Sequence, residues 1–94
     1  MFSADQRVTL QIHPSQERVN ARIVHCSSAH LIVEIDGKAF PPIDADVTVY
    51  LEENHRQYQQ STTVSGHWQH TPKATVELAR LGNAVHFTRQ LGAA

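Results

Sequence analysis

The sequence predicts an all-β protein, built as a small antiparallel barrel of six or seven strands. Apolar and polar residues alternate with a period of two along most of the chain, which is typical of half-buried strands. Turn-forming residues interrupt this alternation at intervals of about 8–12 residues, as in small sandwiches and barrels. A barrel is favoured over a sandwich because closure leaves no exposed strand edge.

The predicted strands follow one another in chain order with short connections. They are Val8–Ile12, Val19–Ile23, Leu31–Ile35, Val47–Leu51, Tyr58–Trp68, Thr75–Leu78 and Val85–Phe87. Pro14 separates the first two strands because proline cannot donate a ladder hydrogen bond. The pair Pro41-Pro42 breaks the chain before the fourth strand. A single domain spanning residues 1–94 is expected from this organisation and from the chain length.

Alternation also predicts which side chains fill the core. These are Val8, Leu10, Ile23, Val33, Val49, Val64 and Phe87. Trp68 shares the even phase of Tyr58 and Val64 and is therefore expected to face inward. Gly66 predicts a bulge or bend within this long strand.

Composition and charge limit the classes of function. The net charge of -1 in 94 residues does not favour long-range attraction to nucleic acid or to an anionic membrane. Cys26 is alone, which fits a reducing compartment, and the N-terminus has no signal-peptide pattern. No apolar run approaches the ~20 residues of a membrane-spanning helix, so we expect no membrane insertion and a cytoplasmic location.

The turn between the second and third predicted strands carries the main functional signal. Its sequence is His25-Cys26-Ser27-Ser28-Ala29-His30. Together with Val64–Trp68 and Leu81–Phe87, this segment resembles the bacterial PilZ family, including the PilZ-like N-terminal domains of flagellar-brake proteins. The resemblance implies a six-stranded antiparallel barrel that binds cyclic di-GMP in many members. It also implies two motifs, Arg-x-x-x-Arg before the first strand and Asp/Asn-x-Ser-x-x-Gly in this turn.

The resemblance also shows that both motifs are degenerate. Ser27 matches the motif serine, but His25 replaces the acid or amide and His30 replaces the glycine. Arg7 is the single arginine before the first strand, so the paired guanidiniums that hold the ligand phosphates are incomplete. We therefore do not expect cyclic di-GMP to bind, and we expect a non-enzymatic signalling adaptor that acts by protein–protein interaction.

Two alternative functions stay open at this point. The first is a cyclic di-GMP receptor that builds its phosphate clamp from other arginines, such as Arg22 or Arg89. The second is an oligonucleotide-binding barrel, which needs basic residues interleaved with aromatic residues on one face. Nucleic acid is not the expected partner, because Trp68, Phe87 and Phe40 are expected in the core rather than as stacking platforms.

Catalytic and metal-binding patterns are weak. Cys26 lies next to His25, but neighbours in a strand point apart and no glycine-rich elbow surrounds them, so no catalytic residue is assigned. His25, Cys26 and His30 lie close in sequence, as do His67 and His70, yet their spacing matches no established zinc motif. We expect neither enzyme activity nor a cofactor or metal.

The partner surface is expected on the degenerate motif, because loops of a scaffold keep functional sites while their chemistry changes. Arg7, His25, Ser27 and His30 would frame this surface. Tyr50 and Tyr58, which flank the charged turn after the fourth strand, are further candidates for partner contacts. The sequence does not name the partner protein, and homodimerisation stays open.

Overall fold

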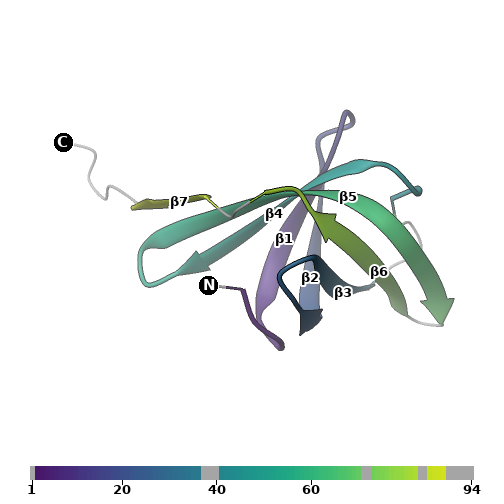
Figure 1. The fold of residues 1–94 in the computed structure, drawn as a ribbon, viewed down its shortest axis with the longest axis horizontal. Coiled ribbons are helices and arrows are strands. Elements are labelled where there is room, and N and C mark those ends of the chain that lie inside the picture. Colours follow the sequence, from purple (N-terminus) through teal and green to yellow (C-terminus); the bar gives the residue numbers. More distant parts are fainter. Residues whose placement is uncertain (1, 37–40, 71–72, 83–84, 89–94) are drawn as a thin grey trace.

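The computed structural model describes residues 2–36, 41–70, 73–82 and 85–88. These residues contain seven antiparallel strands (Figure 1). These strands are β1 (Arg7–Ile12), β2 (Glu17–Cys26), β3 (His30–Asp36), β4 (Asp46–Glu53), β5 (Arg56–His70), β6 (Lys73–Arg80) and β7 (Val85–Thr88). The described residues contain no helix, so the all-β prediction is confirmed.

Six of the strands close into a barrel. The hydrogen-bonded order is β4-β1-β2-β3-β6-β5, and pairing of β4 with β5 completes the circle. The predicted small antiparallel barrel is therefore confirmed. The seventh strand, β7, pairs with Arg56–Gln59 at the start of β5 and lies beside the β4–β5 hairpin, which projects from the barrel in Figure 1.

The barrel consists of two three-stranded meanders. Strands β1, β2 and β3 pair in chain order, and so do β4, β5 and β6. Two further antiparallel pairings, β1 with β4 and β3 with β6, join the meanders. The first strands of the two meanders, β1 and β4, therefore pair with each other, and so do their third strands, β3 and β6.

The hairpin between β4 and β5 has a turn of two residues. Asn54 and His55 both have positive φ angles, 53° and 65°, which is the signature of a type I′ turn. This turn twists in the same sense as the strands and fixes the register, so that Leu51 lies opposite Tyr58.

Inward-facing side chains from all six barrel strands form one apolar core. Val8, Leu10, Ile23, Val33, Val49 and Val64 are all buried, as the alternation predicted. The side chain of Phe87, the seventh predicted core residue, lies outside the described residues, and so does Phe40. Among the described residues, the core therefore consists mostly of aliphatic side chains, with Phe2 packed against them.

The prediction that Trp68 faces inward is wrong. A β-bulge between Val64 and Gly66 sets two residues of β5 opposite Glu77 of β6 and reverses the phase of the strand. Trp68 consequently faces outward, opposite Thr75, with 55% of its surface exposed. The predicted bulge at Gly66 is confirmed, and a Cβ at this glycine would lie 3.3 Å from the Trp68 ring.

Two polar residues, Gln60 and Thr62, are buried on the inner side of β5. Thr62 Oγ1 donates a hydrogen bond of 2.7 Å to the carbonyl oxygen of Val47. Gln60 donates through Nε2 to backbone carbonyls, among them Ser61 at 3.0 Å, and its Oε1 accepts from Arg80. Because buried polar groups are costly unless paired, these bonds offset the cost of placing Gln60 and Thr62 inside the barrel.

Candidate functional site

A second bulge, near the end of β2, determines which side chains next to the β2–β3 turn face outward. The register between β2 and β3 shifts between Ile23 and His25, so that His25 lies opposite Ile32 and Cys26 opposite Leu31. His25 is therefore exposed on the outer surface, whereas Cys26 is half-buried against the core. Without this shift, His25 would have shared the inward phase of Ile23.

Ser27 is bonded within its own turn. Its Oγ accepts hydrogen bonds from the amides of His30 at 3.0 Å and Ala29 at 3.3 Å. The Ser27 amide also donates to the carbonyl of His30 at 2.9 Å. A short hydroxyl side chain often supports a turn in this way. Ser27 thus has a local structural role that needs no ligand.

Arg80, at the end of β6, anchors this turn to the barrel. Its Nη1 donates to the carbonyl of Ser27 at 2.8 Å, and its Nε donates to Gln60 Oε1 at 3.0 Å. Its guanidinium carbon also lies 5.8 Å from the centre of the Phe2 ring. Arg80 was not among the residues predicted from the sequence, although it continues the inward phase of Ala74, Val76 and Leu78 along β6.

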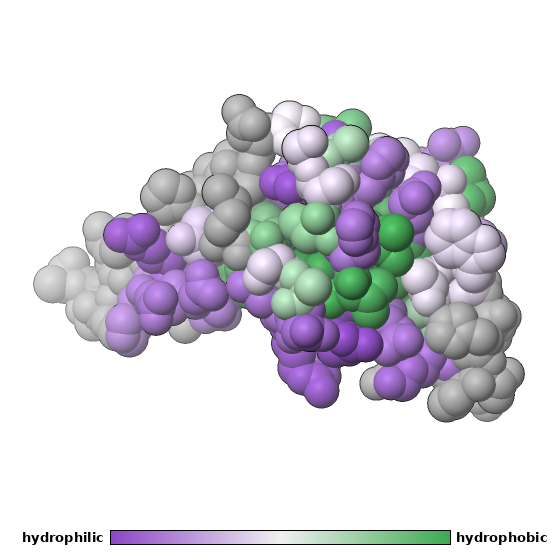
Figure 2. All heavy atoms as spheres, turned by 60° about the horizontal axis from the view of Figure 1, so that its bottom comes forward, coloured by the Kyte–Doolittle hydropathy of each residue, from purple (hydrophilic) through white to green (hydrophobic). Residues whose placement is uncertain are grey.

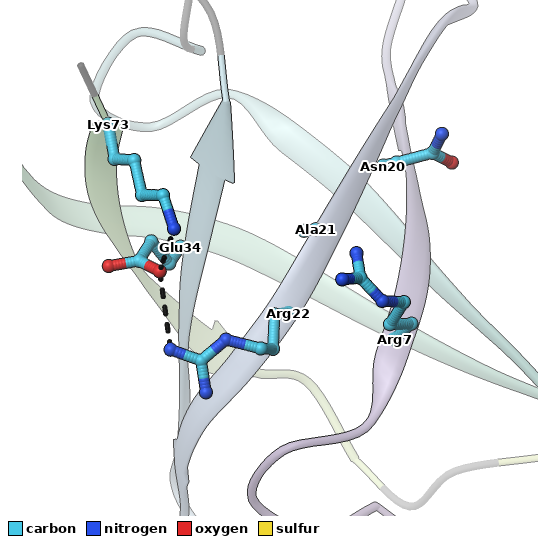
Figure 3. Close-up of a pocket in the computed structure, with 6 residues that line it drawn as sticks. All are labelled: Arg7, Asn20, Ala21, Arg22, Glu34 and Lys73. Carbon is cyan, nitrogen blue, oxygen red and sulfur yellow. Dashed lines mark hydrogen bonds and ion pairs between the residues drawn. The ribbon is translucent and has the colours of Figure 1, made fainter.

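A cluster of charged and polar side chains lies on the outer surface of β1, β2, β3 and the start of β6 (Figure 3). We call it the basic face, and it comprises Arg7, Asn20, Arg22, Glu34 and Lys73, which line a depression of about 70 Å³ together with Ala21. Strand register places Arg7 opposite Arg22, and Arg22 opposite Glu34. Neighbouring strands thus bring together charges that lie far apart in the sequence.

Glu34 joins two of the cations. Its Oε1 accepts from Arg22 Nη2 at 3.2 Å and from Lys73 Nζ at 3.3 Å. The hydrogen bond from Arg22 is the main cause that lowers the pKa of Glu34 below its ordinary value of 4.5, and Lys73 lowers it further, while partial desolvation acts in the opposite direction. Arg22 also donates to Asp5 at 2.7 Å.

The direct Arg7–Arg22 pair is unfavourable. Like charges directly opposite each other on neighbouring strands cost roughly 0.2–1 kcal/mol. Arg22 offsets this through Asp5 and Glu34, but among the described residues Arg7 has no ion pair. In Figure 3 the Arg22 side chain reaches towards Glu34, whereas Arg7 lies on the other side of β2 beside Ala21. Arg7 is therefore the cation of this face that stays available to an external anion.

Removing the Glu34 charge should make stability less dependent on pH in the acid range. Because its folded pKa lies below 4.5, the stabilisation is fully present above this pH and is lost as the pH falls through the folded value. Thermal midpoints of wild type and Glu34→Gln should therefore differ at about pH 7 and converge towards about pH 3. Glu17→Gln, at an exposed position outside the basic face, is the control. A difference that stays constant with pH would contradict the assignment.

The structure divides the predicted partner surface into two parts. Arg7 belongs to the basic face, and its neighbour across the strands is Arg22. His25, Ser27 and His30 belong to the β2–β3 turn, and none of them lines the depression beside Arg7. His25 lies three residues beyond Arg22, or about 10 Å further along β2.

The two predicted tyrosines lie on opposite faces of the β4–β5 hairpin. Tyr50 is on the outer face, where its hydroxyl donates to Gln11 Oε1 at 2.9 Å and Arg18 stacks on its ring at 5.3 Å. Tyr58 lies opposite the buried Leu51 and packs against the core. A single flat partner surface cannot include both tyrosines.

Large apolar side chains are exposed at three described positions, which are Ile43 (47%), Trp68 (55%) and Leu81 (51%). Leu81 adjoins the β2–β3 turn, because the amide of its neighbour Arg80 donates to the carbonyl of Ala29 at 2.8 Å. Figure 2 shows hydrophobic residues gathered in the middle of one face of the molecule, with hydrophilic residues around them. An apolar centre with a polar rim is the usual anatomy of a protein–protein interface.

Comparisons of the chain with family models, with curated proteins and with solved structures found no match. Within the described ranges, no group of three or more His, Cys, Asp or Glu side chains is placed to hold a metal ion. The same residues include no helix that is long and apolar enough to cross a membrane.

Proposed function

We propose that this barrel is a non-enzymatic adaptor domain of bacterial signalling, similar to PilZ domains but acting through protein–protein recognition in the cytoplasm. The proposal rests on the resemblance of the β2–β3 turn and of the later strands to that family. The degenerate motif positions Arg7, His25 and His30 argue for recognition of a protein instead of cyclic di-GMP.

One observation carries the choice of a protein partner. Leu81 exposes half of its surface beside the turn that Arg80 and Ser27 hold in place. A fixed turn next to an exposed apolar side chain offers a pre-organised contact, which lowers the entropic cost of binding. His25, exposed on the adjoining strand, adds a polar group at the edge of this contact.

The double substitution His25→Ala/His30→Ala should weaken partner capture without unfolding the barrel. Both imidazoles lie on the outer side of the strands, so the free energy of unfolding should change by less than about 0.5 kcal/mol. Capture from a bacterial lysate, with identification by mass spectrometry, should fall by about tenfold, as is common when interface contacts are removed.

His55→Asn provides a matched control for this experiment. It removes an exposed imidazole from the β4–β5 turn, and asparagine tolerates the positive φ of that position. The control should capture the same protein as wild type does. If the double variant captures that protein as well as wild type, the interface is not at the turn. If wild type captures no specific protein, the adaptor function itself is contradicted.

A further inference from the structure

Glu34 shows how the cations of the basic face bind a carboxylate. Glu34 of β3 accepts from Arg22 of β2 and from Lys73 of β6, so one carboxylate links cations from the two strands that flank its own. Arg7 and Arg22 lie opposite each other on the directly paired strands β1 and β2, and none of the ion pairs among the described residues joins Arg7 to a carboxylate. Arg7 thus lacks the kind of group that Glu34 supplies one strand further along the sheet.

The space beside Arg7 limits the size of an external group. The depression of about 70 Å³ adjoins a second one of about 270 Å³, and both are lined by Arg7, Asn20 and Ala21. Thr9 adds a hydroxyl to the second depression, and Asn20 adds an amide to both. Among the described residues, those that line the two depressions include no aromatic side chain on which a nucleobase could stack.

The charges of this face suit a single carboxylate. Arg7, Arg22 and Lys73 carry three positive charges, and the ion-paired Asp5 and Glu34 carry two negative charges. Among these described side chains, one positive charge is not balanced by an ion pair, and it belongs to Arg7. A guanidinium binds a carboxylate through two parallel hydrogen bonds, which fits this single charge better than a multiply charged phosphate does.

We propose that Arg7 and Asn20 bind a glutamate or aspartate side chain from an acidic, extended segment of the partner protein. This inference rests on the proposed adaptor function and specifies the chemistry of the partner. The Arg7 guanidinium holds the carboxylate, the Asn20 amide donates a further hydrogen bond, and Arg22 repels a second cation. The segment lies across β1 and β2, on the outer surface of the barrel.

The isolated chain allows a direct test by nuclear magnetic resonance. The probe is the capped dipeptide acetyl-Glu-Glu-amide, titrated while the side-chain N–H signals of the arginines and of Asn20 are followed. The signals of Arg7 and Asn20 should shift and saturate. Arg7→Gln should weaken the binding by at least about fivefold, since it removes a charge-assisted pair. Arg56→Gln removes the same charge from an exposed position at the β4–β5 turn and should leave the binding unchanged.

Parallel titrations with inorganic phosphate and with cyclic di-GMP identify other ligands. Stronger shifts of Arg7 with either of these than with the dipeptide would overturn the carboxylate assignment. Equal shifts at all arginines would also overturn it, because they would show unspecific ion binding. This test needs no partner protein. If the dipeptide fails to bind while wild type still captures a specific protein, the acidic segment is wrong and the adaptor function stands.

Discussion

Replacement of Arg80 by methionine should lower the free energy of unfolding by about 2–4 kcal/mol, as expected when a charged donor of part-buried hydrogen bonds is lost. Arg80 donates to Gln60 Oε1 inside the barrel and to the carbonyl of Ser27 in the turn. Methionine keeps the apolar stem but leaves the buried Gln60 oxygen without this partner. Urea unfolding of wild type and variant measures the difference.

A second substitution separates the hydrogen bonds from the packing of the side chain. The double variant Arg80→Met/Gln60→Leu removes both members of the buried pair, and apolar replacement of both partners is less costly than removal of one. The double variant should therefore recover part of the lost stability. Arg56→Met, at an exposed position, should change the free energy of unfolding by less than about 0.5 kcal/mol. An equally small effect of Arg80→Met would contradict the anchoring role.

Truncation of Leu78 to alanine should cost about 2–5 kcal/mol, the usual range for a large-to-small change in a packed core. Leu78 is fully buried and lies between Leu31 of β3 and Val64 of β5. Trp68→Ala removes a larger side chain, but it should cost less than about 1 kcal/mol because Trp68 is mostly exposed. Urea unfolding of the two variants under the same conditions gives the comparison.

The comparison of these two variants tests the bulge in β5. Without the extra residue between Val64 and Gly66, Trp68 would share the inward phase of Val64 and its truncation would be the more damaging. A larger loss for Trp68→Ala than for Leu78→Ala would therefore contradict the observed register. Fluorescence offers an independent check, since Trp68 is the single tryptophan and its emission should be that of an exposed indole.

Alternation predicts the barrel strands and their buried faces as far as each strand keeps a regular period. Leu10, Val33 and Val49 are buried for this reason. The pattern fails after a bulge, because one inserted residue exchanges the two faces for the rest of the strand. Gly66 indicated the bulge in β5, but glycine alone does not show which residue is extra, and the Trp68 prediction was wrong.

The candidate site was less predictable because it depends on pairing between strands. Ser27 could be found from its place in a turn, whereas the Arg7–Arg22 contact needs the register of β1 with β2. Tyr50 and Tyr58 show the same limit. Both tyrosines have even residue numbers, but the two-residue turn pairs Leu51 with Tyr58. Odd-numbered residues of β4 therefore share a face with even-numbered residues of β5, and the two tyrosines lie on opposite faces.

The two meanders of the barrel behave as two partners that are tethered to each other. Each forms its pairings locally, and the chain between β3 and β4 is the covalent link that holds the meanders at a high effective concentration. The β1–β4 and β3–β6 pairings that join them relate equivalent strands, so two copies that exchanged meanders would form the same hydrogen bonds between molecules. A shorter link would hinder pairing of the two meanders within one chain and would therefore favour such a domain-swapped dimer at high protein concentration.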